Sequence, residues 1–252
     1  MTFFQAVILG FIEGLTEFLP VSSTAHLILA TKWLGIAETD FVKSFVVVIQ
    51  FGAILAVIWL YRKRLWQEPA LWRRALTAFL PTAIIGFLLY KLIKGFLFES
   101  ELVILLALTL GGLILIVFER WHRAGEQNTI SAKQSLIIGG AQALAVIPGV
   151  SRAAATIVGG LALGLSRRAI VEFSFILAIP TMLAATSYDL WQSGANFAPD
   201  DWFLLLVGLI TAFISALIGI KFFLRLIERW SFVAFGLYRI LFAGLVYLWL
   251  AL

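Results

Sequence analysis

The chain has 252 residues, of which 62% are hydrophobic and 13% are charged, and its mean hydropathy is +1.02. These values exclude an ordinary soluble domain and are typical of an integral membrane protein, while the absence of cysteine excludes disulfides, thiolate nucleophiles and metals with sulfur ligands. The net charge of +5 resides in short basic clusters between apolar stretches, a pattern that orients a membrane protein and argues against nucleic acid as a partner.

The first segment, Met1–Thr31, is apolar but interrupted. Pro20 breaks it into halves that are each too short to cross a bilayer, which takes about 20 apolar residues. Glu13 and Glu17 are spaced so that they share one face of a helix. Because a carboxylate at membrane depth costs about 2.5 to 3.5 kcal/mol on insertion scales, the pair indicates a cavity, a cation or a charged partner. The alternative is a pair that packs helices or lies at the interface.

Polar residues follow the break. Ser22, Ser23 and Thr24 can cap the next half-helix, whose N-terminal N–H groups are suited to phosphate. His26 lies on the same helix face as Ser22 and Ser23, which places a nucleophile next to a base. The alternative is that the hydroxyl groups only cap the helix and that His26 satisfies a hydrogen bond in the core.

Six further stretches are long and apolar enough to cross the bilayer. Tryptophans lie near their ends, as in the aromatic belts of membrane proteins. We therefore expect a single all-α polytopic membrane domain over residues 1–252, with about six spanning helices and two broken re-entrant helical hairpins. The predicted spans are Val42 to Tyr61, Ala75 to Leu92, Leu102 to Phe118, Ile170 to Leu190, Trp202 to Leu224 and Phe232 to Leu252.

The second broken segment, Gln134–Leu165, has a similar design. A Pro-Gly pair interrupts it, and Ser151 can cap the half-helix that follows. Arg152 supplies a planar, permanently charged fork suited to phosphate oxygens, and Thr156 lies one turn further along the same face. The alternative is that Arg152 only neutralises one of the two carboxylates of the first segment.

The basic loops indicate how the segments are oriented. With these loops in the cytoplasm, each broken segment enters and leaves on the same side of the membrane, and the two enter from opposite faces. A gapless shift aligns Leu19-Pro20 with Ile147-Pro148 and Ser23 with Ser151. The sequence therefore predicts an inverted-topology repeat, with halves of approximately 1–120 and 130–252, whose site forms where the two breaks meet.

Together these groups predict a site for a multiply charged phosphate ester at the membrane. Carboxylates that face phosphate repel it unless a divalent cation lies between them or one of them is protonated and acts as an acid. We therefore expect Mg²⁺ or Ca²⁺, with Glu13 and Glu17 as its ligands. Arg239, in the last span, either reaches the site or pairs with a carboxylate, and a structural role is favoured.

Five motifs carry a resemblance to a known family. The sequence resembles the undecaprenyl-diphosphate phosphatase family of bacteria, the bacitracin-resistance type, over nearly its whole length. The first and third motifs are highly specific. The motifs are EGLTEFLPVSSTAH at 13 to 26, VIQFGAILAV at 48 to 57, AQALAVIPGVSR at 141 to 152, EFSFILAIPTM at 172 to 182 and FGLYRI at 235 to 240.

The resemblance implies hydrolysis of the terminal phosphate of a C55 isoprenoid diphosphate, which regenerates the monophosphate carrier used in cell-wall synthesis. It also implies a multi-pass protein of the bacterial cell membrane, and the charge count favours a site that opens to the outer face. The expected partners are the polyprenyl diphosphate and the bilayer, and a homodimer is left open. The family's motif residues correspond to Glu13, Glu17, Ser22, Ser23, His26, Ser151, Arg152 and Thr156.

The chain departs from the family pattern at three positions. Ala153 stands where the family usually has serine, Ala154 replaces the usual glycine, and Val46 stands where members commonly carry an acid. These changes weaken any role for the missing hydroxyl group. The principal ionisable groups are intact, so activity is expected.

The favoured mechanism has Ser23 attack the distal phosphorus while His26 takes its proton. Glu17 orients the histidine or holds the metal, and Glu13 holds the cation or positions water. Arg152 and the amides of both half-helices stabilise the phosphoryl oxygens, with Ser22, Thr24, Ser151 and Thr156 as further phosphate-binding residues. One alternative makes His26 the nucleophile. Another is a lipid-phosphate transporter or flippase, which would use the same groups without a nucleophile.

Overall fold

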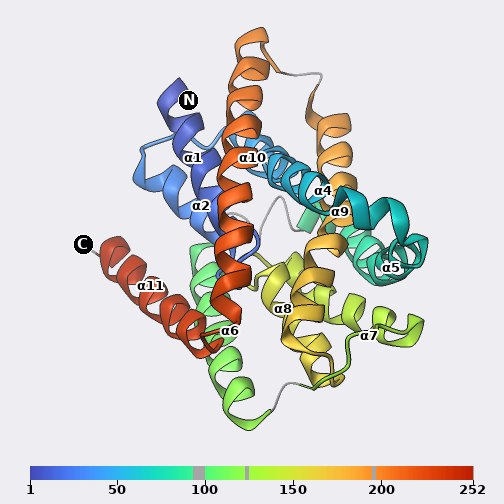
Figure 1. Ribbon diagram of the computed structural model, residues 1–252. Coiled ribbons are helices and arrows are strands. Elements are labelled where there is room, and N and C mark those ends of the chain that lie inside the picture. Colours follow the sequence, from blue (N-terminus) through green and yellow to red (C-terminus); the bar gives the residue numbers. More distant parts are fainter. Residues whose placement is uncertain (93–99, 123–124, 195–196, 252) are drawn as a thin grey trace.

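The computed structural model describes residues 1–92, 100–122, 125–194 and 197–251. These residues form helices joined by short turns, with one isolated β-bridge between Gln127 and Leu165. The helices are α1 (Phe3–Thr16), α2 (Ser23–Trp33), α3 (Asp40–Val48), α4 (Gln50–Gln67), α5 (Pro69–Leu92), α6 (Glu101–Trp121), α7 (Ala132–Ala143), the 3₁₀ turn η2 (Leu144–Val146), α8 (Arg152–Ala162), α9 (Arg167–Ser193), α10 (Pro199–Ile227) and α11 (Val233–Ala251) (Figure 1).

The described residues contain six helices that are long and apolar enough to cross a membrane, as predicted. The first is α3 continued by α4, which are separated only by Ile49 in a near-helical conformation. The others are α5, α6, α9, α10 and α11. Large apolar side chains cover the outward faces of α5, α6, α10 and α11. Such a surface is stable only in lipid, because water would have to solvate it along the whole length of each helix.

Both predicted breaks are present. α1 ends at Thr16, and the chain turns through Pro20 before α2 begins at Ser23. In the second half, α7 passes through η2 into a turn before α8 begins at Arg152. α2 and α8 are 11 residues each, which is too short to span the bilayer. Each therefore forms one arm of a helical hairpin, packed against α1 or α7.

The residue that precedes each of these short helices has an unusual backbone. Ser22 has φ +71° and Ser151 has φ +73°, and they are the two non-glycine residues with positive φ in the described part of the chain. Ser151 caps α8 as predicted, since its Oγ accepts the N–H of Ala154 at 3.2 Å. The side chain of Ser22 makes no such bond, so the prediction of a hydroxyl cap fails there. Strained backbone of this kind persists where the surroundings fix it, often at functional sites.

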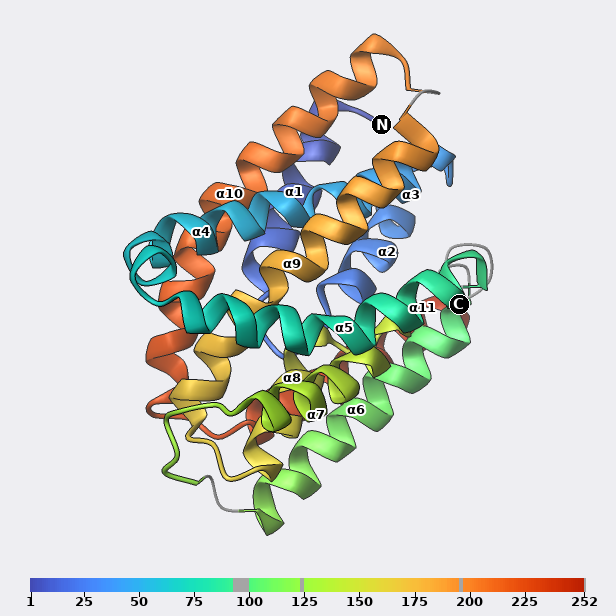
Figure 2. The ribbon, with the colours of Figure 1, turned by 90° about the vertical axis from the view of Figure 1, so that its right-hand side faces the viewer.

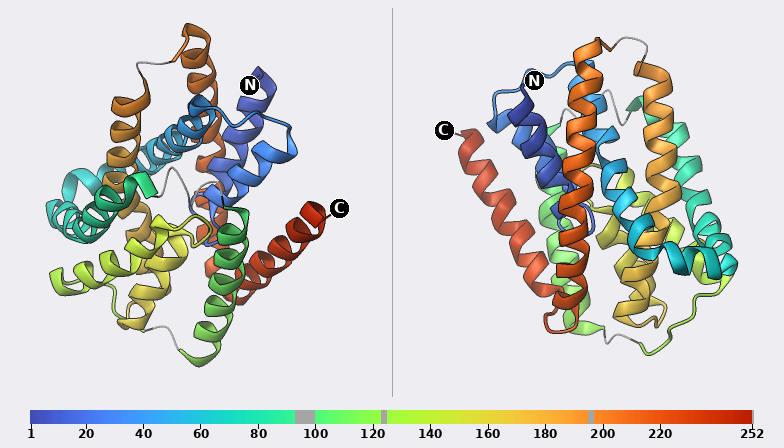
Figure 3. Two further views of the ribbon diagram at one scale, coloured as in Figure 1. Left: turned by 180° about the vertical axis from the view of Figure 1, so that it is seen from behind. Right: turned by 45° about the horizontal axis from the view of Figure 1, so that its top comes forward.

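Small residues bring the long helices together. α1 lies against α10 (Figure 1), and a Cβ atom added to Gly10 or Gly14 would collide with the α10 backbone. α6 lies beside α11 (Figure 3, left), with Gly112 facing Gly236. Within lipid, where apolar burial does not drive helix association, close backbone approach of this kind supplies the packing energy. The contact with α10 fixes α1, the first arm of the first hairpin, in the bundle.

The second half of the chain repeats the order of elements of the first. A short broken hairpin is followed by three long helical segments in each half: α3–α4, α5 and α6, and then α9, α10 and α11. The helix starts pair Ser151 with Ser22 and Arg152 with Ser23, one residue away from the gapless alignment. The order agrees with the predicted repeat, and its inverted topology stays a prediction.

Candidate active site

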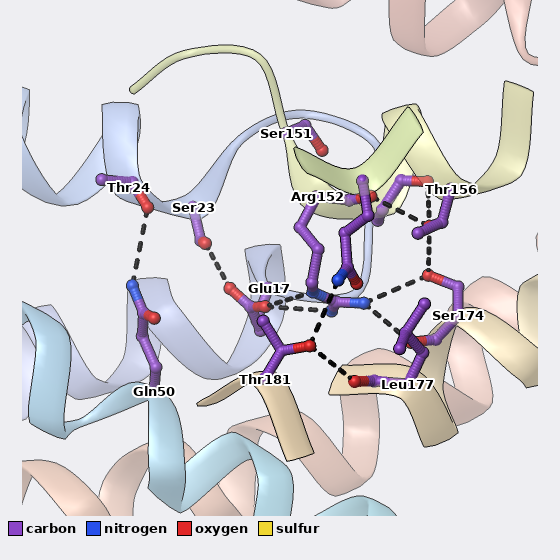
Figure 4. Close-up of polar contacts among 12 residues, drawn as sticks. Glu17, Ser23, Thr24, Gln50, Ser151, Arg152, Thr156, Ser174, Leu177 and Thr181 are labelled. Carbon is purple, nitrogen blue, oxygen red and sulfur yellow. Dashed lines mark hydrogen bonds and ion pairs between the residues drawn. The ribbon is translucent and has the colours of Figure 1, made fainter. Parts of the chain in front are cut away.

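The two breaks meet at an ion pair between Glu17 and Arg152. Glu17 lies just after α1, and Arg152 is the first residue of α8. Oε1 of Glu17 accepts from Nη2 of Arg152 at 3.0 Å and from its Nε at 3.3 Å (Figure 4). Both side chains are almost fully buried, at 3% and 6% exposure. The predicted convergence of the two broken segments is therefore present in the structure.

The same carboxylate also binds Ser23. The Ser23 hydroxyl donates to Oε2 of Glu17 at 2.5 Å, while Oε1 faces Arg152 (Figure 4). Each carboxylate oxygen thus has its own partner. The arrangement fixes Ser23 Oγ at the start of α2 and aims its proton at a base.

The far side of the Arg152 guanidinium is held by α9. Its Nη1 donates to the Ser174 carbonyl at 2.7 Å and to Ser174 Oγ at 3.1 Å. Thr156 Oγ1 lies 2.8 Å from Ser174 Oγ and also donates to the Arg152 carbonyl at 2.9 Å. Thr156 is fully buried, so it steadies Arg152 through Ser174. Sequence reasoning missed Ser174, although it lies within the motif EFSFILAIPTM.

His26 points away from this cluster. Its Nδ1 lies 2.8 Å from the Ser22 carbonyl and its Nε2 lies 2.8 Å from the Tyr238 hydroxyl. The ring stacks on Phe242, with centroids 4.2 Å apart. Both nitrogens are therefore engaged, and the structure does not bring His26 into a hydrogen bond with Ser23. Tyr238 was also missed, although it belongs to the motif FGLYRI.

Glu13 is the second buried carboxylate. It has no solvent exposure, neither of its oxygens has a hydrogen-bond partner among the described residues, and it lies close enough to Glu17 for the two charges to interact. Within the described residues, no group of three or more His, Cys, Asp or Glu side chains could hold a metal ion. Glu13 together with Glu17 nevertheless fits a hard divalent cation, because both oxygens of Glu13 are unpartnered and Mg²⁺ takes one or two protein carboxylates and completes its shell with water and substrate phosphate.

A cavity of about 480 Å³ opens beside the ion pair. Six of the predicted site residues line it, whereas Glu13, His26 and Thr156 do not. The remaining walls come mainly from apolar residues of α5, the turn after η2 and α9. The six predicted residues, at the polar end, are Glu17, Ser22, Ser23, Thr24, Ser151 and Arg152.

Arg239 joins both breaks to α6. Its side chain is completely buried and contacts no carboxylate of the described residues, which agrees with the structural role favoured from the sequence. Each of its five N–H groups instead donates to a backbone carbonyl, at 2.7 to 3.4 Å. The acceptors are the carbonyl groups of Pro20, Ala107, Leu108, Gly149 and Val150.

The three departures from the family pattern lie in packed positions. Ala153 is fully buried, and Ala154 and Val46 are 5% and 3% exposed. None of them lines the cavity. The altered side chains therefore pack against protein and leave the polar end of the cavity unchanged.

Comparison with known proteins identifies the family. A family model described as bacitracin resistance protein BacA matches residues 6–245. Proteins named undecaprenyl-diphosphatase are similar over nearly the whole chain: one from Aquifex aeolicus is 53% identical over 98% of both chains, and one from Sulfurihydrogenibium sp. is 50% identical over 99% of this chain and 100% of its own. A third, from Persephonella marina, is 48% identical over 98% of both chains. The chain with the Glu17–Arg152 pair and its cavity belongs to the bacitracin resistance protein BacA family.

Proposed function

We propose that the protein hydrolyses undecaprenyl diphosphate, a C55 polyprenyl diphosphate, to the monophosphate and inorganic phosphate. Relatives at 48 to 53% identity are named for this activity. The observation that carries the proposal is the contact of Ser23 and Arg152 with one carboxylate at the polar end of a cavity whose other walls are mostly apolar. A polyprenyl diphosphate matches this cavity, because its anionic head suits the polar end and its hydrocarbon chain suits the apolar walls.

The nucleophile is Ser23, and its base is Glu17. Ser23 Oγ attacks the distal phosphorus as its proton passes to Oε2 of Glu17, and the bond from that phosphorus to the bridging oxygen breaks. The prenyl monophosphate leaves with that oxygen. Water then attacks the phosphoserine, the bond from phosphorus to the Ser23 oxygen breaks, and that oxygen departs with the proton from Glu17. Both protons of the water stay on the inorganic phosphate, which gives one of them to bulk water after release.

Arg152 and the helix starts supply positive charge for the phosphoryl oxygens. Arg152 is held by Glu17 and Ser174, so its guanidinium is in place before the lipid binds. The first N–H groups of α2 receive no side-chain cap, which leaves them free for phosphate oxygens. Thr24 and Ser151, which line the same end of the cavity, add hydroxyl donors.

Glu13, together with Glu17, would hold a divalent cation, Mg²⁺ or Ca²⁺. When bound, such a cation screens the negative charge of the diphosphate from the two carboxylates. The buried, unpartnered oxygens of Glu13 support this assignment.

His26 acts as a positioning residue in this scheme. A neutral imidazole that donates from Nδ1 to the Ser22 carbonyl and accepts the Tyr238 hydroxyl at Nε2 satisfies both contacts. The histidine thereby fixes the positive-φ residue Ser22 and, through it, the start of α2. Proton transfer from Ser23 falls to the carboxylate that it contacts.

The protein lies in the bacterial cell membrane, and its cavity opens toward the outer face. The basic clusters mark the cytoplasmic ends of the helices, at the end of α4 and the start of α9. The cavity extends toward the opposite ends, because its walls include Lys43 near the start of α3 and Tyr188 near the end of α9.

Phosphate release from pure protein tests the proposal. The protein in detergent is given undecaprenyl diphosphate, with and without EDTA, and inorganic phosphate is measured. Release that requires Ser23, and disappears in Ser23→Ala with an unchanged unfolding temperature, supports the enzyme. Binding of the lipid without release would favour the transporter, which needs no nucleophile.

A further inference from the structure

α5 and α9 lie against each other (Figure 2). Residues of both helices line the apolar part of the cavity, and one face of α5 supplies a wall of it. Phe87 lines the cavity and is also 69% exposed on the lipid-facing surface. Its ring packs edge-on against Tyr188 of α9, with centroids 6.0 Å apart. The cavity therefore reaches from the buried Glu17–Arg152 pair to the bilayer side of the helices.

Gly86 lies on this wall, and the usual reason for a glycine inside a helix is absent there. Glycine costs about 1 kcal/mol relative to alanine in a helix interior. At Gly112 and Gly139 the close approach of a neighbouring backbone explains the residue, because an added Cβ would collide with it. A Cβ added at Gly86 would meet no atom of the described residues within 4 Å, and the residue lines the cavity. The missing side chain leaves space in the cavity.

Two hydrogen bonds link the helices next to the space beside Gly86. Gln142 of α7 donates to Thr82 of α5 at 2.8 Å and to Thr181 of α9 at 3.2 Å. These bonds join α5, α7 and α9 next to the polar end of the cavity. The gap beside Gly86 therefore borders a point where the three helices are linked.

We propose that the gap beside Gly86 receives the first isoprene units of the lipid, and that the size of residue 86 determines whether a prenyl chain can enter beside the diphosphate. The assignment rests on the proposed function. Three observations support it. The gap is continuous with the polar end of the cavity, the cavity walls there are mainly apolar, and the cavity opens toward the bilayer at Phe87. An isoprene chain has no hydrogen-bonding groups, so such walls suit it.

The absence of cysteine allows a direct test, because a single thiol can be placed at either of two glycines. Gly86→Cys is the test variant. Gly244→Cys is the matched control: Gly244 lies in the spanning helix α11, is exposed, does not line the cavity, and also has nothing within 4 Å of an added Cβ. The rate of labelling by a small maleimide is measured in detergent with undecaprenyl monophosphate, with inorganic pyrophosphate, or with neither.

The lipid is expected to slow labelling at position 86 by about tenfold or more, since it covers the thiol, and to leave position 244 unchanged. Pyrophosphate, which has no chain, is expected to leave both rates unchanged. Equal protection by pyrophosphate, or no protection by the lipid, would overturn the assignment. Phosphate release by the unmodified protein is measured in parallel, so protection without hydrolysis retains the assignment and rejects the proposed function.

A second variant measures the consequence for turnover. Gly86→Trp is expected to raise KM for undecaprenyl diphosphate by about tenfold or more, because the indole fills the space for the chain, whereas Gly244→Trp keeps KM within about twofold. An unchanged KM in Gly86→Trp would contradict the assignment. Unfolding temperatures of both variants show whether each is folded.

Discussion

Glu17 and Arg152 are separated by 135 positions in the sequence and form a buried ion pair with a 3.0 Å contact. Glu17 lies at the start of the first break and Arg152 directly after the second, so the pair exists only if both hairpins reach the same point. The pair also orders the reaction site, because the carboxylate that holds the guanidinium accepts the Ser23 proton.

Breaking this pair from either side should destabilise the protein. Arg152→Met leaves Glu17 without its charged partner, and Glu17→Gln does the reverse. Each is expected to cost about 3 to 5 kcal/mol of the free energy of unfolding. The double variant should recover part of that loss, since neither buried charge is left unpaired. Unfolding in detergent measures the cycle, and strictly additive losses would show that the two groups do not interact.

Glu13→Gln tests whether Glu13 binds a divalent cation. The substitution is expected to change the unfolding temperature in EDTA little, because the amide has the size and shape of the carboxyl group that it replaces. The same variant should lose the activation and the stabilisation that Mg²⁺ or Ca²⁺ gives to the unmodified protein. A variant that responds to the cations as before would remove Glu13 from the cation site.

His26→Asn tests the positioning role. The asparagine amide can donate to the Ser22 carbonyl in place of Nδ1, so part of the activity should remain. The fall in kcat should stay well below the loss expected when a general base is removed, because the base is Glu17. A fall in kcat of about 10⁴-fold would identify His26 as the base. Tyr238→Phe, which removes only the contact at Nε2, serves as the milder companion variant.

The five hydrogen bonds of Arg239, called the Arg239 clamp below, hold both breaks against α6. Their loss should therefore destabilise both hairpins. Arg239→Met would leave five buried carbonyl groups without these donors, at about 1 to 3 kcal/mol for each group that stays unsatisfied. Arg239→Lys should be intermediate. Gly111→Ala should produce a similar, smaller loss of stability and turnover, because its Cβ would collide with the guanidinium. Gly140→Ala, which meets nothing within 4 Å, is the control. Equal behaviour of the two alanine variants would refute the clamp.

The spans and the two breaks could be predicted because their signals are local. Apolar length identifies a spanning helix, and Pro20 with the polar run after it identifies a turn within one. That charges at membrane depth need partners led to the alternative in which Arg152 neutralises Glu13 or Glu17, but the sequence did not say which of the two carboxylates it meets.

The orientation of the histidine could not be predicted from spacing alone. His26 follows Ser23 by three positions, which leaves it about 60° short of a full helical turn. That angle directs the imidazole to α11, where Tyr238 and Phe242 receive it. The role of Ser174 could not be predicted for a related reason. Nothing in the neighbouring sequence marks a serine inside a spanning helix as functional, and its contact with Arg152 depends on α8 lying beside α9.

The most direct test of the central claim is to trap the phosphoenzyme. The protein is mixed briefly with undecaprenyl diphosphate labelled in its terminal phosphate, quenched, and digested to locate the label. Acid-stable phosphoserine is expected at Ser23 of the unmodified protein and is expected to be absent from Ser23→Ala. Acid-labile phosphohistidine at His26 would contradict it.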